Sequence, residues 1–502
     1  MATRLKNGDL VQVRVGSLGA DGLASAELDD AASALGEVAA PAGSAANGTR
    51  TQAPALVVGN ALPQETGSAL VIHAGARRSV LRMVDLSSPP HPARVEPSCP
   101  HWTPASPCQL LHMSKAAQLE LKRAQVQSAV EHLAPTPNVS DCVSHGAALG
   151  WRSRITYAML DDRGKAELGA YRRGSHQVQP MLSCLLPEPA LLKASERIQA
   201  LLQDYLRLLP RGKVARDDGC GEPASVSQLK GTLGRKFPAP RAGTPPALLE
   251  HLALRSSAKG QVMACYLGKI PSGSAASRDL AELCERTVSQ AGVHSVYAGP
   301  SGAGDAIFGA SAPTWMAGAK SLWESVDGLE FELLPRTFFQ VHRAAAARLQ
   351  RDTIDLVVGT RVLDVFSGVG ALALRAAKQG KVVTAIEAIP EAIQLGNSNA
   401  ERNGVSVTFV LGDATAQLAA LSPGFDTILV NPPRKGLGSD LAGELGRLKP
   451  QRLLYISCNP RSLARDLADL AVVGYVSREL RPYDLFPGSE HVETLAVLEP
   501  AG

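Results

Sequence analysis

The feature that most constrains the fold is an alternation of strand-like and helix-like segments that begins at Arg361. Apolar runs predict strands over 361–366, 381–387, 405–411, 427–431 and 453–458. The segments between them predict helices over 371–378, 390–403, 414–421, 440–448 and 462–470. Strands that alternate with helices form βαβ units, whose strands lie parallel in one sheet. The sequence therefore predicts an α/β, Rossmann-like domain in this region.

The N-terminal region has a different pattern, with short strands between turns rich in Gly, Ala and Asp. Residues 11–15 alternate apolar and polar side chains, and 55–58 and 70–73 continue the series, which predicts a small β-barrel. Residues 209–248 form a Pro-, Gly- and charge-rich insertion. Because 502 residues exceed one ordinary core, we expect three domains: a barrel over 1–90, a central α+β domain over 91–345 and the Rossmann-like domain over 346–502.

Composition argues against several broad classes of protein. Basic and acidic residues nearly balance, 51 against 47, and the net charge of +4 neither requires nor opposes a nucleic-acid partner. The sequence has no uninterrupted apolar run long enough to cross a membrane, and its first residues form no apolar signal core. Eight cysteines in 502 residues do not suggest a secreted disulfide framework. We therefore expect a cytoplasmic protein without a membrane partner.

A Gly loop follows the first strand of the alternating region. Residues 364–370 read Asp-Val-Phe-Ser-Gly-Val-Gly, and their glycines let the backbone approach a ligand closely. Glu387 ends the next strand, 19 residues after Gly368, where a carboxylate can bind ribose hydroxyls. Ala373 replaces the third glycine of a dinucleotide site, so S-adenosylmethionine fits better than NAD. An ordinary tight turn is the alternative, but Glu387 and Asp413, after the following strand, favour the cofactor.

Two further segments point to the same edge of the sheet. Residues 431–434, Asn-Pro-Pro-Arg, end the fourth predicted strand, and ligands of open α/β sheets bind at the carboxyl ends of strands. A proline-terminated strand leading into a loop is the alternative interpretation. Gln340 precedes a helical run, and its amide can hydrogen-bond the amino-acid end of the cofactor.

Cys458 and Glu493 are the candidate reacting residues. Cys458 ends the fifth predicted strand, and the neighbouring Arg461 with the following helix N-terminus is expected to lower its pKa. Glu493 lies 35 residues later in a strand-like run. A thiolate that attacks carbon and a carboxylate that removes a proton are what methylation of an unactivated pyrimidine carbon requires. The alternatives are a buried structural cysteine and a solvent-facing strand glutamate.

Taken together, these motifs resemble those of the RNA 5-methyluridine methyltransferase family. The resemblance covers most of the chain and is strongest over residues 331–499. Its markers, in chain order, are Phe339-Gln340, the Gly loop 364–370, Asn399-Ala400 with Asn403-Gly404, residues 431–434, Ser457-Cys458-Asn459-Pro460, and Phe486-Pro487 with residues 491–493.

The resemblance implies an S-adenosylmethionine-dependent enzyme that methylates C5 of a uridine in rRNA or tRNA, with an RNA-binding TRAM-like barrel over residues 1–90. It implies that Cys458 adds to C6 of the uracil, that C5 then attacks the methyl group, and that Glu493 removes the C5 proton. RNA is the expected partner, and we expect a monomer. The residues that it implies around the cofactor are Gln340, Phe366, Glu387, Asp413 and Asn431.

The chain departs from the family pattern at two positions near the expected cofactor. Asn431 stands where the family usually has Asp, so an acceptor is kept but a charge is lost, which predicts a shift in rate or in base preference. Ser367 stands where the family usually has Cys in the Gly loop, and we expect little effect from it.

A third departure concerns metal binding. Many members hold a [4Fe-4S] cluster through four cysteines, and the resemblance assigns Cys99, Cys108 and Cys184 to three of these positions. Ala105 stands at the second position. Three thiolates are one short of the usual four, so we expect the cluster to be lost, labile or completed by an outside group.

Two other functions stay open. Asn-Pro-Pro motifs also serve amino-group methylation of bases, which needs no cysteine nucleophile. A non-catalytic RNA-binding or folding protein on the same scaffold is the second alternative. The Cys458 and Glu493 pair argues against both, whereas Ala105 and Asn431 keep the non-catalytic alternative open.

Overall fold

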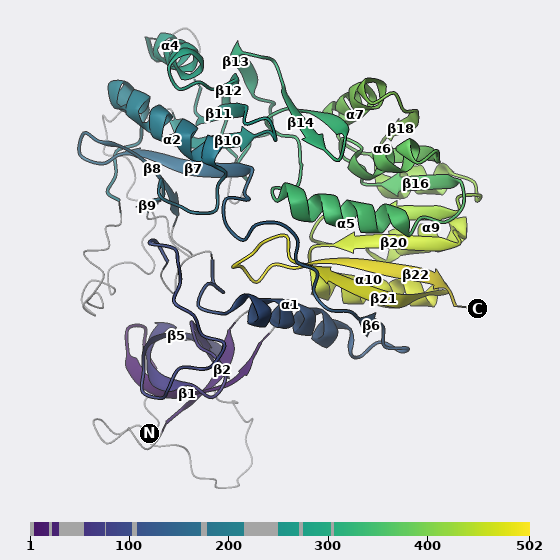
Figure 1. Ribbon diagram of the computed structural model, residues 1–502, viewed down its shortest axis with the longest axis horizontal. Helices are drawn as coiled ribbons and strands as arrows, with labels where there is room; N and C mark the ends of the chain where they lie inside the picture. The colour runs from purple at the N-terminus through teal and green to yellow at the C-terminus, as the bar shows by residue number, and fades with distance from the viewer. Residues whose placement is uncertain are drawn as a thin grey trace.

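The computed structural model describes residues 5–19, 23–29, 55–75, 77–102, 108–171, 178–214, 249–270, 275–302 and 306–501. Within these ranges the strands form a closed barrel, a central sheet, a two-stranded hairpin and a C-terminal sheet (Figure 1). Most of the expected insertion, residues 215–248, lies outside the described residues. None of the helices in the described ranges has the length and apolarity needed to span a membrane.

The N-terminal barrel closes because β1 pairs antiparallel with both β2 and β4. Alternate side chains of a barrel strand face inward, and Val13, Val15, Leu81 and Met83 accordingly lie in its buried interior. The predicted small β-barrel is confirmed. Its strands, in spatial order, are β1 (Leu10–Leu18), β2 (Ala24–Leu28), β3 (Ala55–Gly59), β5 (Arg78–Leu86) and β4 (Thr66–His73).

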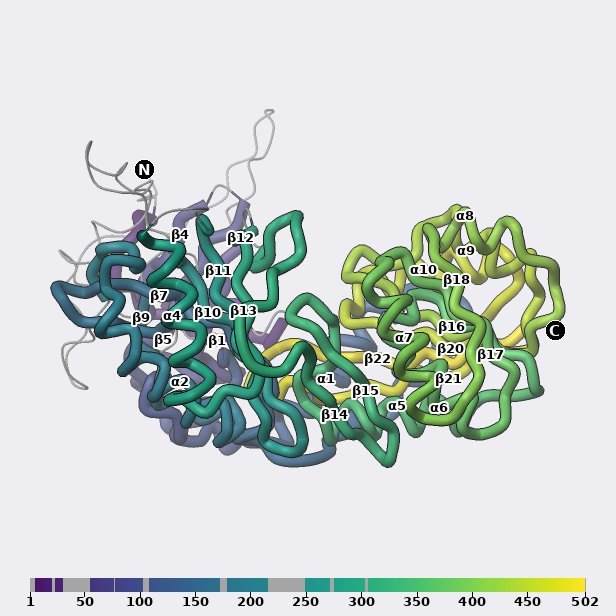
Figure 2. The backbone as a smooth tube through the Cα atoms, turned by 90° about the horizontal axis from the view of Figure 1, so that it is seen from above, coloured from purple at the N-terminus to yellow at the C-terminus, as the bar shows by residue number. Residues whose placement is uncertain are grey.

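The central sheet is mostly antiparallel and is covered by helices. Its strands, in spatial order, are β13 (Thr314–Gly318), β12 (Ser295–Pro300), β11 (Val262–Gly268), β10 (Leu249–Ser256), β7 (Arg154–Asp161), β8 (Ala166–Tyr171) and β9 (Val178–Pro180). Helices α2 (Pro189–Leu202) and α4 (Ala275–Ser289) and the 3-10 helix η2 (Gln203–Leu208) bury their apolar side chains against one face. The hairpin of β14 (Leu322–Val326) and β15 (Leu329–Leu333) follows, and Figure 2 shows it between the central and C-terminal sheets.

The C-terminal sheet has the predicted βαβ succession, which confirms the Rossmann-like fold. Its strands, in spatial order, are β18 (Val407–Leu411), β17 (Val382–Glu387), β16 (Arg361–Val365), β19 (Thr427–Val430), β20 (Arg452–Ser457), β22 (Glu493–Pro500), β21 (Tyr475–Tyr483) and β6 (Asn138–Val139). The first five in this order are parallel, and β22 runs antiparallel to β20 and β21.

Helices cover both faces of this sheet, which is why its strands are apolar on both sides. Along β16, Val362 packs with α5 and α6, whereas Leu363 and Val365 pack with α8, α9 and α10. The bounds of these helices and of α7, which lies on the α6 side, are α5 (Arg343–Asp355), α6 (Ala371–Lys378), α7 (Pro390–Arg402), α8 (Ala414–Ala420), α9 (Ser439–Leu448) and α10 (Pro460–Val472).

One segment from the first third of the chain also packs on the C-terminal sheet. Helix α1 (Lys115–Val130) buries Val126 and Val130 against α10 and β21, and β6 pairs with β21. Figure 1 shows α1 between the barrel and this sheet. The expected central domain, 91–345, includes this segment, and its end falls inside α5. The domain boundaries stay a prediction.

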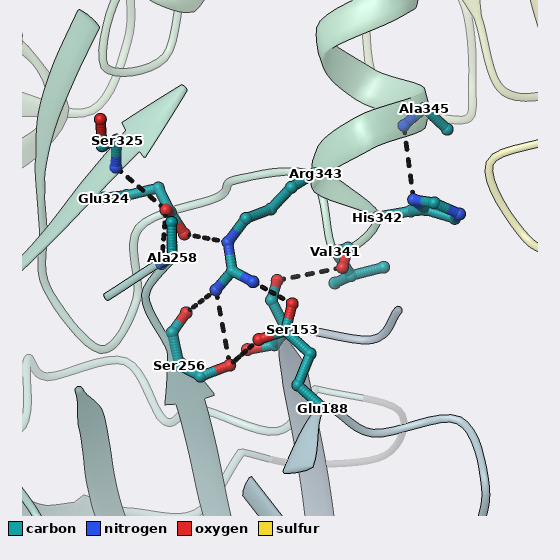
Figure 3. A network of polar contacts seen from close by, with 10 residues as sticks. All are labelled: Ser153, Glu188, Ser256, Ala258, Glu324, Ser325, Val341, His342, Arg343 and Ala345. Carbon is teal, nitrogen blue, oxygen red and sulfur yellow. Dashed lines mark hydrogen bonds and ion pairs between the residues drawn. The ribbon is translucent and has the colours of Figure 1, made fainter. Parts of the chain in front are cut away.

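Arg343, the first residue of α5, joins the hairpin to the central sheet at the start of the helix that packs on the C-terminal sheet (Figure 3). Its Nε donates to Glu324 of β14 at 2.5 Å, and its other nitrogens donate to Glu188 and to the carbonyl of Ser256. The Oγ of Ser256 donates to Glu188 at 2.6 Å. Because Glu324 is almost fully buried, this network orients α5 and the residues before it, including Gln340.

Candidate active site

The loops that carry the predicted residues leave the C-terminal sheet where its strand order reverses. β16 lies between β17 and β19, and the chain passes from β16 to β17 on one side before it returns to β19 on the other. Such a switch point is the usual ligand crevice of an open α/β sheet. The loops after β16, β17, β19 and β20 meet at this edge.

The Gly loop after β16 has an unusual backbone. Phe366 has φ 65°, which is uncommon for a bulky residue and costs about 1–3 kcal/mol. Gly368 has φ 56°, and a Cβ there would face open space, whereas a Cβ on Gly370 would lie 2.5 Å from the Leu374 side chain. Asp364, below the loop, accepts from the Ala373 N–H at 3.0 Å, and burial raises its pKa to about 7. The loop is therefore held in a strained form with open space above Gly368.

Glu387 and Asp413 both lie at the expected strand ends. The Oε2 of Glu387 accepts from the Gly368 N–H at 2.9 Å, and its Oε1 accepts from the Ile389 N–H at 2.9 Å. Asp413 is the N-cap of α8, and its Oδ1 accepts from the first-turn N–H groups. A carboxylate oxygen can accept more than one hydrogen bond, so these contacts are compatible with ligand binding. A role in binding ribose stays a prediction for Glu387.

Asn431 and Gln340 lie on neighbouring parts of the site. Asn431 follows β19, is half-buried, and donates its N–H to the Val365 carbonyl at 3.3 Å, next to Phe366. Gln340 is half-buried, and the adjacent Phe339 packs in the cluster that contains Val369 of the Gly loop. The structure thus brings both residues to the Gly loop, and their contact with a cofactor stays a prediction.

Two asparagines that the sequence analysis used only as markers hold this part of the structure together. Asn399 of α7 is fully buried, donates to the Val369 carbonyl at 3.2 Å and accepts from the Glu332 N–H of β15 at 2.6 Å. Asn403 exchanges two hydrogen bonds with the backbone of Glu330. They therefore fix the β14–β15 hairpin to the Gly loop, and the pairing with β15 was not apparent from their positions in the sequence.

Cys458 and Glu493 lie opposite each other. β20 and β22 are antiparallel, with Ser457 paired to Thr494, so the next pair in register is Cys458 with Glu493. Cys458 is half-buried, and Glu493 is only 4% exposed. Glu493 is thus not a solvent-facing strand residue, and the structure brings the two candidate reacting residues together.

The electrostatics of this pair differ from what the sequence predicted. Burial and the neighbouring Glu493 raise the pKa of the Cys458 thiol, and the nearby Arg434 guanidinium opposes this. Burial raises the pKa of Glu493 to about 8, against the same Arg434. The expectation that Arg461 and the helix N-terminus lower the pKa of Cys458 was therefore wrong. Arg461 is exposed, and the cation at the pair is Arg434.

Arg434 is held by a loop whose anchor the sequence analysis missed. Its carbonyl accepts from the Asn459 side chain at 3.3 Å. The buried Asp466 of α10 accepts from the Leu437 N–H at 2.8 Å and from the Tyr455 hydroxyl at 2.7 Å. The loop after residues 431–434 is thereby tied to the helix that follows Cys458.

Cys99, Cys108 and Cys184 lie in one neighbourhood. Burial, together with the nearby Cys184 and Cys99, raises the pKa of Cys108 to about 12. In the part of the chain that the structure describes, however, no group of three or more possible ligands is arranged to hold a metal ion. Ala105 lies outside the described residues. The described residues do not fit a four-iron cluster as placed, and no step of the chemistry below involves one.

Comparisons with known proteins identify relatives of this chain. A family model described as tRNA (uracil-5-)-methyltransferase matches residues 336–500. An uncharacterized RNA methyltransferase of Listeria monocytogenes serotype 4b is 30% identical over 420 residues, covering 81% of this chain and 84% of that protein. One of Gloeobacter violaceus is 29% identical over 464 residues, covering 89% and 92%.

A solved structure has the same fold over nearly the whole chain. It is the Pyrococcus abyssi tRNA (uracil-54, C5)-methyltransferase in complex with S-adenosyl-L-homocysteine, with a TM-score of 0.69, 22% identity, and coverage of 97% of this chain and 100% of that one. This likeness shows that the two chains share a fold. The chain belongs to the family of RNA uracil methyltransferases.

Proposed function

We propose that this protein transfers the methyl group of S-adenosylmethionine to C5 of a uridine in rRNA or tRNA through a covalent adduct with Cys458. The observation that carries this proposal is the register of β20 and β22, which brings Cys458, just after β20, opposite Glu493, with Arg434 near both. A thiol, a carboxyl group and a guanidinium that lie near one another at a ligand crevice match a reaction that needs a nucleophile, a base and a cation near a thiolate.

The Gly-loop edge suits S-adenosylmethionine, which supplies the methyl group. The open space above Gly368 leaves room for a ligand close to the backbone. Glu387 and Asp413 at the ends of neighbouring strands would hold the nucleoside end, and Phe366, Asn431 and Gln340 would surround the rest.

The chemistry follows from the charges of this chain's own residues. The Cys458 sulfur, once deprotonated, bonds to C6 of the uracil, and the electrons of the C5=C6 bond move to C5 and the O4 enolate. C5 then bonds to the methyl carbon while the bond from that carbon to the sulfonium sulfur breaks, which leaves S-adenosylhomocysteine. Glu493 takes the C5 proton, the C5=C6 bond reforms, and the sulfur leaves with its electron pair. A base with a pKa of about 8 is well matched to neutral pH, and Arg434 stabilises the thiolate before attack and after release.

An RNA substrate is supported by the surface around Cys458. Lys435, Arg461 and Arg465 are exposed there. Lys435 and Arg465 also line a hollow of about 540 Å³ beside the loop after residues 431–434. Cations that flank a reacting residue suit the phosphates of a nucleic-acid strand. A monomeric state and a cytoplasmic location stay predictions.

Mass mapping of methylated nucleosides tests this proposal. RNA from cells that lack the gene should lose 5-methyluridine at a defined position, and separate rRNA and tRNA fractions identify the substrate. The wild-type gene should restore the modification, whereas Cys458→Ala should not. Cys284→Ala, a buried cysteine of α4, is the control that should restore it. Restoration by Cys458→Ala would overturn the adduct mechanism.

The same map addresses the second candidate, amino-group methylation of a base. The observation that favours it is Asn431 before Pro432 and Pro433, where the family usually has Asp. Loss of an N-methylated base with unchanged 5-methyluridine would support it. Unchanged RNA modification would support the non-catalytic alternative instead.

A further inference from the structure

A fully buried lysine hydrogen-bonds the loop between β21 and β22, which leads to Glu493. Lys122 of α1 has an exposed fraction of 0%, and its ammonium donates to the Asp484 carboxylate at 2.5 Å and to the Phe486 carbonyl at 3.1 Å. Lys115, two turns earlier, donates to the other oxygen of Asp484. Lys122 therefore holds two points of residues 484–488, which we call the Glu493 support loop.

Gln118, one turn before Lys122 on the same face of α1, holds a third point. Its Oε1 accepts from the Gly488 N–H at 3.0 Å, and its Nε2 donates to the carbonyls of Leu110 and Met113. Leu110 in turn donates its N–H to the Gly488 carbonyl at 2.9 Å. Both backbone groups of Gly488 are thus bonded by α1 and the residues just before it.

The support loop is also held on its other side. The Asp484 N–H donates to the Val143 carbonyl at 2.8 Å, and the Asp484 carboxylate accepts from the Phe486 N–H at 3.2 Å. Phe486 packs edge-on against Trp151, with ring centroids 6.3 Å apart. Glu493 begins β22 a few residues after this loop, so the position of the loop sets where the carboxyl group meets Cys458.

Stability alone is a weak explanation for this buried pair. Removing two charges from water is costly, and buried ion pairs are often no more stabilising than apolar residues of the same volume. Burial lowers the pKa of Lys122 while Asp484 opposes this, and the two lysines hold the pKa of Asp484 low. A charged pair does, however, prefer one geometry, because the ammonium must satisfy both the carboxylate and the Phe486 carbonyl.

We propose that Lys122 and Gln118 are positioning residues for the base Glu493. Through the Glu493 support loop, they keep the carboxyl group of Glu493 opposite Cys458 while the C5 proton is removed. This assignment rests on the proposed function. It concerns the release step and not the binding of S-adenosylmethionine, because the support loop joins β21 to β22, and these strands lie on the other side of β20 from β16, which carries the Gly loop.

The test uses full-length Lys122→Met and Gln118→Leu with wild type, Glu493→Gln and the control Arg123→Gln. Arg123 is the next residue on α1 and pairs only with Glu120 among the ion pairs of the described residues. Three quantities are measured on each: affinity for S-adenosylmethionine by calorimetry, turnover on substrate RNA, and the fraction of protein in an RNA adduct on a denaturing gel.

We expect Lys122→Met to lower turnover about 10- to 100-fold and to accumulate adduct, as Glu493→Gln does, with cofactor affinity within about twofold of wild type. Gln118→Leu should change turnover and adduct accumulation in the same direction but by a smaller amount. It serves as the test if Lys122→Met does not fold. Arg123→Gln should behave as wild type.

Two results would overturn the assignment. The first is wild-type turnover in both variants. The second is a parallel loss of cofactor affinity and turnover without adduct, which is what a merely structural role would give. If Glu493→Gln forms adduct and the α1 variants do not, only the positioning assignment fails. If Glu493→Gln also forms none, the proposed chemistry fails with it.

Discussion

The two sides of the crevice are assembled from very different stretches of chain. On the Gly-loop side, residues 364–370 are held by Asp364, Glu387 and Asn399 through hydrogen bonds that span 9, 19 and 30 residues. On the thiol side, formed by Cys458, Glu493 and the Glu493 support loop, the bonds from Lys122 and Gln118 span 362 and 370 residues.

This difference teaches that the two sides can fail separately. The Gly-loop side is built within one βαβ succession, so its geometry follows from local turns and strand ends. The thiol side depends on α1, which packs on α10 and β21. Loss of a contact from α1 is therefore expected to impair chemistry and leave cofactor binding largely intact.

The largest expected effect is that of Glu493→Gln. Loss of the base should lower turnover about 10²- to 10⁴-fold and leave a stable RNA adduct, because the C5 proton cannot be removed, while cofactor affinity stays near wild type. Gel electrophoresis under denaturing conditions measures the adduct, and calorimetry measures the cofactor affinity. Glu499→Gln, at the other end of β22, is the control and should turn over normally. A wild-type rate without adduct would show that Glu493 is not the base.

The second effect is a pH dependence of the protein's free energy of unfolding, which comes from Glu493 on the thiol side. Burial raises the pKa of Glu493 from 4.5 to about 8, so the folded state binds this proton more tightly than the unfolded state. The contribution of Glu493 to the free energy of unfolding is therefore fully present below pH 4.5. It falls by up to about 1.4 kcal/mol per pH unit until about pH 8. Glu493→Gln should remove this decline.

Denaturant unfolding of wild type and Glu493→Gln between pH 5 and 9 measures the difference. The comparison isolates Glu493, because Asp364, whose pKa burial raises to about 7, is present in both proteins. Equal pH slopes in the two proteins would mean that Glu493 is not a buried acid.

A smaller effect is expected on the Gly-loop side. Glu387→Gln weakens the bonds to Gly368 and Ile389, so affinity for S-adenosylmethionine should fall about 10- to 100-fold, as expected for about 1.5–3 kcal/mol of lost hydrogen bonding. At saturating cofactor the rate of adduct formation should be near wild type. Calorimetry and single-turnover gels test both, with the exposed Glu401 of α7 changed to Gln as control. An unchanged affinity would contradict the role of Glu387.

The smallest effect on activity is expected at Cys99, Cys108 and Cys184. Cys108 and Cys184 pack in one cluster with Phe486, which belongs to the thiol side. Protein purified in air should contain little iron, and Ala105→Cys should raise the iron content after anaerobic reconstitution, because four thiolates are then available. Turnover should change by no more than about twofold. Near-stoichiometric iron and sulfide in the wild-type protein would show that another group supplies the fourth ligand.

Local patterns were enough to predict the Gly-loop side. The period of the strands and helices predicted the parallel sheet, and the spacing of Gly368 and Glu387 placed two residues that now share a hydrogen bond of 2.9 Å. Ala105 and Asn431 were visible as departures because the resemblance to a family supplies the usual residue at each position. The prediction about Arg461 was wrong because it used nearness in sequence, whereas Arg434 reaches Cys458 from the end of a different strand.

By itself, the sequence determined the fold class, the family and the identity of the candidate reacting residues, because these are encoded in side-chain periods and in motifs a few residues long. Only the tertiary structure decided that Cys458 faces Glu493, that burial raises both pKa values, and that Lys122 and Gln118 hold the loop between β21 and β22. Those facts depend on strand register and on contacts between residues more than 300 positions apart. Periodicity carries no signal for such contacts, since it reports only which face of an element is buried and not which distant residue covers it.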